Sequence, residues 1–483
     1  MQRLGSITML VPCLLTLARS IPWLTLPQGD SPMPQLPKTI GRVLLASTLA
    51  LPLGVRAAPG PVASQRNALL QASAAVCPGC SLGSIERRLL TDEVAEYSVA
   101  LRVGPGEFDI IGLHRVVKEQ APFVPSFTSG AVLLAHGDVW PFDAAFLASA
   151  ASATTSDSHA LPVFLAAHGL DVWGIDFRWT RVPLATTDFS FMADWGIETD
   201  ACDLGIALAV ARVTRALTGH GFGKLHLLGW SRGGQIGYAY LNAETQVPAP
   251  LRQVKGFIPV DIYLKTNVDA LREAACIRYT STQARIDGGE IADSIGQVVN
   301  ALGVLASTAP GDLSPIIPGL TNEQAGLLAG AATFLLLPPG LAPAPFYHFT
   351  GGSFVDGVPT GLLYTDEQLF FTFLAGGSPW QPLKELAEAD AAICDGPEAP
   401  DVPWDEHLGA ITVPVLYVGA GGGFGDFGIY TTTLLDSDDV STLVVSLQPP
   451  ELRSVDFGHA DLFQADNAPT LVWEPILAWL QAH

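Results

Sequence analysis

Short apolar runs alternate with helical stretches through the middle of this chain. Residues 131–135, 171–175 and 225–228 form three such runs, each largely apolar, and 206–217 is the clearest helical stretch between them. A strand needs this composition when both of its faces are buried, as in a parallel sheet that helices cover on both sides. The alternation therefore predicts an α/β fold with a mostly parallel central sheet and helices on both faces.

The pattern continues on either side of these runs. Residues 97–103 and 110–117 are expected to form early strands, joined by the Gly-Pro-Gly turn at 104–106. Residues 254–260 predict the next strand, but the strand expected after it, 413–418, lies far down the chain. Because this separation greatly exceeds an ordinary connection between neighbouring elements, it indicates a large insertion.

The predicted insertion, residues 261–407, is rich in Ala, Leu, Gly and Pro. Helices are expected inside it at 290–305, 322–335 and 365–374. Open α/β sheets bind ligands at the carboxyl edge of their strands, so we interpret the insertion as a mainly helical cap over that edge. It divides the catalytic core into a first part, 58–260, and a second part, 408–483. An independent second domain is the alternative interpretation.

The leader, residues 1–57, differs from the rest of the chain. Two basic residues precede an apolar run at 43–55, and small residues surround a cleavage point at the end of the leader. This pattern predicts a secretory signal peptide at about 33–57, with Met33 as the true start and 1–32 as a wrongly assigned beginning. A membrane anchor is disfavoured because the run is far shorter than the roughly 20 residues that a span needs. We expect an extracellular or periplasmic protein.

Charge and cysteine content add to this picture. The formal net charge of −22 disfavours binding to phosphate backbones and anionic lipid headgroups. Neither nucleic acid as a partner nor stable membrane insertion is therefore expected.

Removal of the leader leaves an odd number of cysteines, so one is expected to be unpaired. Cys77-Pro-Gly-Cys80 predicts a local structural disulfide, since the chain has no second such pair for zinc. Cys276 and Cys394 both fall in the insertion and could be joined there.

The strongest chemical signal is the segment 229–233, which reads Gly-Trp-Ser-Arg-Gly. It directly follows the strand expected at 225–228 and precedes a helical stretch at 234–242. Such a sharp strand-to-helix turn exposes its central residue, and glycines two positions away avoid a clash. Ser231 is therefore the predicted nucleophile.

A serine hydroxyl needs a histidine base, which a carboxylate orients in turn. His459 is the predicted base because it lies in a late loop, after a strand-like run at 452–455 and before a terminal helix at 469–480. Asp426 is the predicted acid because it leaves the strand at 413–418 through a glycine-rich loop. The rivals for the acid are Asp261, at the end of the preceding strand, Asp436 and Asp438.

The remaining parts of the predicted site surround Ser231. A developing oxyanion needs fixed N–H donors, and we expect these from the backbone of Arg232 and of Asp138, with Val139 in reserve. Asp138 belongs to a His-Gly-Asp loop that follows the strand expected at 131–135. Trp140 and Trp230, together with Phe177 and Trp179, are expected to line an apolar substrate pocket, with packing in the core as the alternative. The mechanism requires neither a metal nor a cofactor.

These features together resemble the α/β-hydrolase superfamily, and within it the acid lipases with a large helical cap. The resemblance rests on the His-Gly loop at 136–137, the stretch 165–176, the strand-to-helix turn at 229–233 that carries Ser231, and the His-Ala-Asp segment at 459–461. It implies an α/β-hydrolase fold, an ester substrate and no cofactor.

We therefore expect a secreted serine carboxylic-ester hydrolase that acts on a small-molecule, lipid or polymeric ester. The first alternative is a secreted serine peptidase or amidase, in which acidic residues of the cap hold a substrate amino terminus. Glu385, Glu388 and Asp390 are the candidates for that role. The second alternative is a binding protein that kept the fold without the activity.

Overall fold

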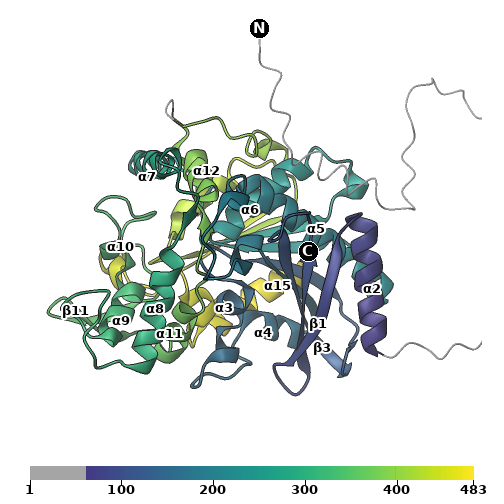
Figure 1. The fold of residues 1–483 in the computed structure, drawn as a ribbon, viewed down its shortest axis with the longest axis horizontal. Helices are drawn as coiled ribbons and strands as arrows, with labels where there is room; N and C mark the ends of the chain where they lie inside the picture. The colour runs from purple at the N-terminus through teal and green to yellow at the C-terminus, as the bar shows by residue number, and fades with distance from the viewer. Residues whose placement is uncertain (1–60, 397–398) are drawn as a thin grey trace, which may run out of the picture.

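A twisted sheet runs through the centre of the computed structural model, which describes residues 61–483 apart from 397 and 398 (Figure 1). The predicted leader, with its signal peptide at 33–57, lies outside the described residues. In spatial order the strands are β1 (Ser81–Leu89), β2 (Val94–Arg102), β3 (Ile110–Ala121), β6 (Leu170–Asp176), β5 (Gly130–Ala135), β7 (Leu225–Trp230), β8 (Val254–Val260), β13 (Val415–Ala420) and β14 (Val440–Val445), with β4 (Val124–Pro125) beside β3. From β6 to β14 all neighbours are parallel, which confirms the predicted mostly parallel sheet.

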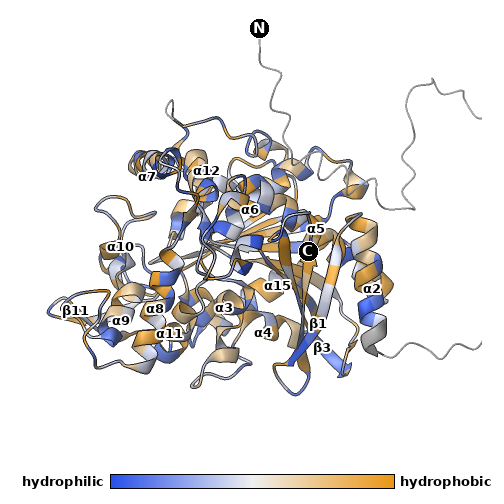
Figure 2. Cartoon of the chain, in the orientation of Figure 1, coloured by the Kyte–Doolittle hydropathy of each residue, from blue (hydrophilic) through white to orange (hydrophobic). Residues whose placement is uncertain are grey.

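Alternation along the central strands builds a core on each face of this sheet. In β5, Leu133 packs into one core and its neighbours Val132 and Leu134 pack into the other. The first core includes residues of α5 (Ile197–Leu217) and α6 (Arg232–Glu244). The second includes residues of α4 (Leu161–Ala167) and α15 (Glu474–Ala482). Figure 2 shows the central strands mostly in the colours of hydrophobic residues, as expected for strands buried on both sides.

The structure differs from the sequence prediction at the sheet edges, in one loop and in the insertion. The edge strands β1 and β14 were not predicted, and neither shows the continuous apolar pattern of a strand buried on both faces. The strand expected at 452–455 is wrong, because Pro450–Val455 is a 3-10 helix. The helix expected at 322–335 divides into α9 (Asn322–Ala331) and α10 (Thr333–Leu336).

A large, mainly helical insertion separates β8 from β13. It contains α7 (Asp269–Asp287), α8 (Ile295–Thr308), α9, α10, the hairpin β10 (Gly352–Val355) and β11 (Val358–Leu362), α11 (Glu367–Ala375), α12 (Leu383–Cys394), and the short paired strands β9 (Ala292–Asp293) and β12 (Gln381–Pro382). Figure 1 shows α8, α9 and α11 grouped together beside the sheet. None of the described helices is both long and apolar enough to cross a membrane.

Both disulfides expected from the sequence are present. Cys77 is bonded to Cys80, and Cys276 on α7 is bonded to Cys394 at the end of α12. The second bond ties together two helices of the insertion that are 118 residues apart in the chain. The expectation of an unpaired cysteine is wrong for the described residues, since none of them is a free cysteine.

Candidate active site

Ser231 lies on a strained turn between β7 and α6. Its φ of 55° and ψ of −128° are unusual for a residue with a side chain. A Cβ atom added to Gly229 would lie 2.3 Å from the carbonyl oxygen of Gly233, and one added to Gly233 would lie 2.3 Å from that of Ala135. The turn therefore requires both glycines of the 229–233 segment, and it lifts the serine out of the sheet edge.

The carboxylate that orients His459 is Asp261. Nδ1 of His459 donates to Oδ2 of Asp261 at 2.7 Å, and both side chains are buried. Asp261 directly follows β8, the neighbour of the nucleophile strand. The prediction of Asp426 is therefore wrong in this structure: its side chain is exposed to solvent, while His459 bonds to Asp261. Asp436 and Asp438 are exposed as well.

The glycine-rich loop after β13 holds Asp261 instead of delivering Asp426. Backbone N–H groups of Ala420, Phe424 and Gly425 donate to Oδ1 of Asp261 at 2.8, 3.0 and 3.1 Å. A Cβ atom added to Gly423 would lie 2.0 Å from Oδ2 of Asp261. The loop can approach the carboxylate this closely only because glycine stands there. The N–H of Phe424 is shared with Oδ2 at 3.1 Å, and Oδ2 is also the atom that faces His459.

Aromatic rings enclose the imidazole of His459. The ring of Trp230 stacks on it, with the centroids 4.9 Å apart. Tyr347 and Phe349 from the insertion and Phe424 from the core lie 5.4 to 5.7 Å away. The imidazole of His459 therefore has Asp261 as the polar partner of Nδ1, and aromatic rings surround the rest of the ring.

The insertion also binds the backbone of the His459 loop. The N–H of His459 donates to the carbonyl of His348 at 3.0 Å, and the N–H of Ala460 donates to that of Phe349 at 2.7 Å. The carboxylate of Asp461 accepts the N–H of Gly351 at 2.9 Å. The segment 347–351 is therefore a structural support for the base.

The two predicted oxyanion residues lie on either side of Ser231. A Cβ atom added to Gly137 would lie 2.7 Å from Cβ of Ser231, so the loop that continues into Asp138 touches the nucleophile. Within the described residues, the N–H groups of Asp138 and Val139 donate to no backbone acceptor. The N–H of Arg232 belongs to the first turn of α6, where helical N–H groups lack an acceptor in their own helix.

A cavity of about 430 Å³ opens in front of Ser231 and His459. The predicted pocket residues Trp140 and Trp230 both line it. Much of its wall comes from apolar side chains of the insertion, among them Val299, Leu302, Ile316, Ala329, Leu336 and Leu337. Phe177 and Trp179 do not line it and pack on the ring of His136 instead. The arrangement places Ser231 and His459 together on the wall of a largely apolar cavity.

The three acidic residues proposed for a peptidase do not line this cavity. Glu385 is fully buried, and burial raises its pKa to about 8. Glu388 accepts the N–H of Ile197 at the start of α5 at 2.8 Å. Asp390 pairs with Arg278 at 2.6 Å. All three serve contacts within the protein, so none offers a site for a substrate amino group.

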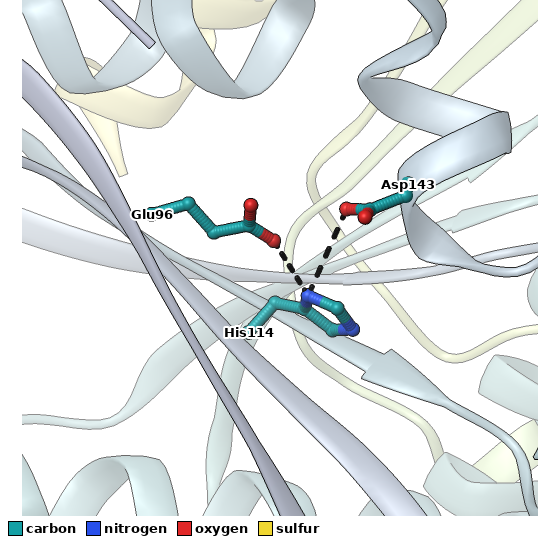
Figure 3. Close-up of side chains that lie close together, drawn as sticks. All are labelled: Glu96, His114 and Asp143. Carbon is teal, nitrogen blue, oxygen red and sulfur yellow. Dashed lines mark hydrogen bonds and ion pairs between the residues drawn. The ribbon is translucent and has the colours of Figure 1, made fainter. Parts of the chain in front are cut away.

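Three side chains of a kind that binds metals lie together outside this cavity: Glu96, His114 and Asp143 (Figure 3). Nδ1 of His114 is 2.7 Å from Glu96 and 3.9 Å from Asp143. Arg88 is bound to both carboxylates, at 2.7 and 3.0 Å. Because a guanidinium already balances these carboxylates, we interpret the cluster as an ion-pair network.

His114 carries the second positive charge of this network. Burial alone would lower its pKa, but the nearby charge of Asp176 and hydrogen bonds with Asp176 and Glu96 raise it well above the ordinary value. Burial raises the pKa of Asp143 to about 6. His114 is thus protonated at neutral pH and joins β2, β3 and the end of β6.

The comparisons with known proteins support the fold. No protein-family model matches the sequence, and no curated protein matches it. A solved structure of a candidate lipase from Sulfolobus solfataricus matches with a TM-score of 0.57 at 18% identity, over 84% of this chain and 99% of that one. An esterase from Thermogutta terrifontis matches with a TM-score of 0.36 at 14% identity, over 83% and 99%. The first likeness shows that the chain has the α/β-hydrolase fold.

If Ser231, His459 and Asp261 act together as a catalytic triad, Asp261→Asn should leave the fold intact and lower kcat by about 10⁴-fold, because an amide holds the imidazole in the wrong tautomer. Asp426→Asn is the matched control and should keep kcat near the wild-type value. Steady-state kinetics of both variants check this assignment. A large loss in Asp426→Asn with activity kept in Asp261→Asn would contradict it.

His114→Gln should destabilise the protein by about 3 kcal/mol in mildly acidic buffer, because the buried carboxylate of Asp176 loses its partner at 3.1 Å. Arg88 still balances Glu96 and Asp143 in this variant. A raised pKa in the folded state gives stability that is complete below the unfolded value of about 6.5 and is lost as the pH rises through the folded value. The difference from wild type should therefore shrink in alkaline buffer.

Urea unfolding of wild type and variant at two pH values measures this difference. His168→Gln, which replaces an exposed histidine, is the control and should show little dependence on pH. An equal difference at both pH values would contradict the assigned charge of His114.

Proposed function

We propose that this protein is a serine hydrolase that cleaves carboxylic esters through an acyl-enzyme. The observation that carries the proposal is the buried Asp261–His459 pair, which opens on the same cavity as Ser231. Such a pair is what a serine hydroxyl needs to become a nucleophile near neutral pH. The α/β-hydrolase fold supports the proposal without proving it, since one fold serves many functions.

In the proposed reaction, Oγ of Ser231 attacks the ester carbonyl while Nε2 of His459 takes its proton. Asp261 holds the imidazole and stabilises the imidazolium. The N–H groups of Arg232 and Asp138 bind the oxyanion. Collapse of the intermediate breaks the bond to the alcohol, which leaves with the proton from His459. Water then attacks the acyl carbonyl and gives a proton to His459. When this second intermediate collapses, the bond to Oγ breaks, His459 returns the proton to Ser231, and the acid leaves.

The cavity favours an ester with an apolar acyl chain. Its walls around Ser231 are largely aliphatic and aromatic, and the insertion supplies many of them. The peptidase alternative loses its main support because the acidic residues of α12 are engaged inside the protein. Export remains part of the proposal, on the leader pattern and the two disulfides.

A fluorophosphonate probe should form a covalent adduct on Ser231 of the wild-type protein. Ser231→Ala should lose the adduct, and its ester turnover should fall by roughly 10⁴-fold or more while the protein stays folded. Ser190→Ala, at an exposed serine, is the control and should be labelled like wild type. Peptide mapping locates the adduct. A wild-type protein with neither adduct nor turnover would favour the non-enzymatic binding protein.

For p-nitrophenyl esters, kcat/KM should rise from acetyl to longer chains until the cavity is filled. Each buried CH₂ contributes about 0.8 kcal/mol, which corresponds to at most roughly fourfold per group. Leu302→Trp should reduce kcat/KM for octanoyl esters more than for acetyl esters, because Leu302 lines the cavity. Val304→Trp, on the exposed side of the same helix, is the control. Equal losses for both esters in Leu302→Trp would contradict an acyl pocket here.

A further inference from the structure

The side chains of the two oxyanion residues are joined to each other. Nε of Arg232 donates to Oδ1 of Asp138 at 3.0 Å, and Nη2 donates to Oδ2 at 3.0 Å. This two-pronged geometry fixes both distance and orientation. Asp138 belongs to the loop after β5, whereas Arg232 opens α6. The ion pair therefore joins the two elements that carry the predicted oxyanion N–H groups.

Neighbours on both sides hold this ion pair in place. Gln381 of the insertion donates to Oδ1 of Asp138 at 2.5 Å, and Arg232 also donates to Gln235. Gln235 is itself fixed by a bond to the carbonyl of Tyr263 at 2.9 Å. Burial would lower the pKa of Arg232, but the charge of Asp138 outweighs it and raises the pKa, so the guanidinium stays charged.

The loop that carries Asp138 has a strained backbone. Val139 has a φ of 71°, which a β-branched residue rarely adopts, and the N–H of Trp140 closes a tight turn on the carbonyl of Asp138 at 2.8 Å. Strain of this kind persists only where surrounding contacts enforce it. The N–H of Ser378 binds the carbonyl of Val139 at 2.8 Å, and the ion pair binds the residue before it.

We propose that the Asp138–Arg232 ion pair is a positioning device for the oxyanion hole, completed by Gln381 of the insertion. It keeps the strained loop against the first turn of α6, so that the two N–H groups converge on one point in front of Ser231. Asp138 and Arg232 act here through their side chains on the placement of their own backbones. The inference rests on the proposed ester hydrolysis.

A positioning role and a purely electrostatic role both predict a slower Arg232→Gln variant, but they make opposite predictions for Asp138→Asn. Arg232→Gln leaves the negative charge of Asp138 beside the oxyanion, whereas Asp138→Asn leaves the positive charge of Arg232 there. If the pair acted through its electric field alone, the first change would slow acylation and the second would speed it. If it acts by position, both changes slow the reaction, because both release the loop.

The test measures kcat and KM of Arg232→Gln and Asp138→Asn with one p-nitrophenyl ester. In both variants kcat should fall roughly 10-fold to 100-fold, somewhat less than the loss of a whole oxyanion donor, with KM within about threefold of wild type. Arg232→Lys keeps the positive charge but loses the paired N–H donors of the guanidinium. Its kcat should therefore lie between that of wild type and that of Arg232→Gln. Asp138→Asn combined with Arg232→Gln should be no worse than about the poorer single variant.

The control separates positioning from general loss of stability. Arg87 forms a similar ion pair with Glu119 on β1 and β3, through Nε at 3.1 Å. Neither residue lines the cavity, so Arg87→Gln should lower the melting temperature and keep kcat. Wild-type kcat in Arg232→Gln, a rise of kcat in Asp138→Asn, or the same loss in Arg87→Gln would each overturn the inference.

Two further outcomes are decisive. If Arg232→Gln does not fold, Gln381→Met and Arg232→Lys replace it, and unchanged kcat in both overturns the inference. If the wild-type protein neither reacts with a fluorophosphonate nor hydrolyses esters, the proposed function fails, and the positioning role fails with it. Wild-type turnover with unaffected variants rejects the positioning role alone.

Discussion

The buried carboxylate of Asp261 is the group on which the rest of the site depends. A buried charge without partners is too costly for a fold to keep, so every lone pair that the protein hides must be satisfied. Three backbone N–H groups of the loop after β13 donate to Oδ1 of Asp261, and Nδ1 of His459 donates to Oδ2. The loop reaches the carboxylate because Gly423 has no side chain to stand between them. One interaction thus explains the glycines, the burial and the placement of the base.

Local patterns predicted the parts of the site that short-range sterics determine. Buried parallel strands must be apolar on both faces, and the strand-to-helix turn must have glycines around Ser231, so both can be found in the sequence. The edge strands β1 and β14 were missed because neither shows the continuous apolar run of a strand buried on both faces: β1 carries charged residues, and Ser441 and Thr442 interrupt β14. The apolar helical stretches of the insertion were found approximately, but α7 and α12 were not predicted.

The acid illustrates what local patterns leave open. Asp261 and Asp426 follow the neighbouring parallel strands β8 and β13, so both leave the sheet at the same edge. A flexible glycine-rich loop is compatible with delivering a carboxylate and with wrapping around one. Only the long-range pairing of His459 with the residue directly after β8 distinguishes these cases. The signal in the sequence was the position of Asp261 immediately after a fully buried strand.

The insertion takes part in the site as well as covering it. Its segment 347–351 supports the His459 loop through backbone hydrogen bonds, while Tyr347 and Phe349 close the aromatic enclosure around the imidazole. In the proposed reaction His459 becomes an imidazolium, and the stacked ring of Trp230 would stabilise it, because aromatic faces attract cations. A displacement of this segment would therefore disturb the base itself, so the catalytic core and the insertion form one functional unit.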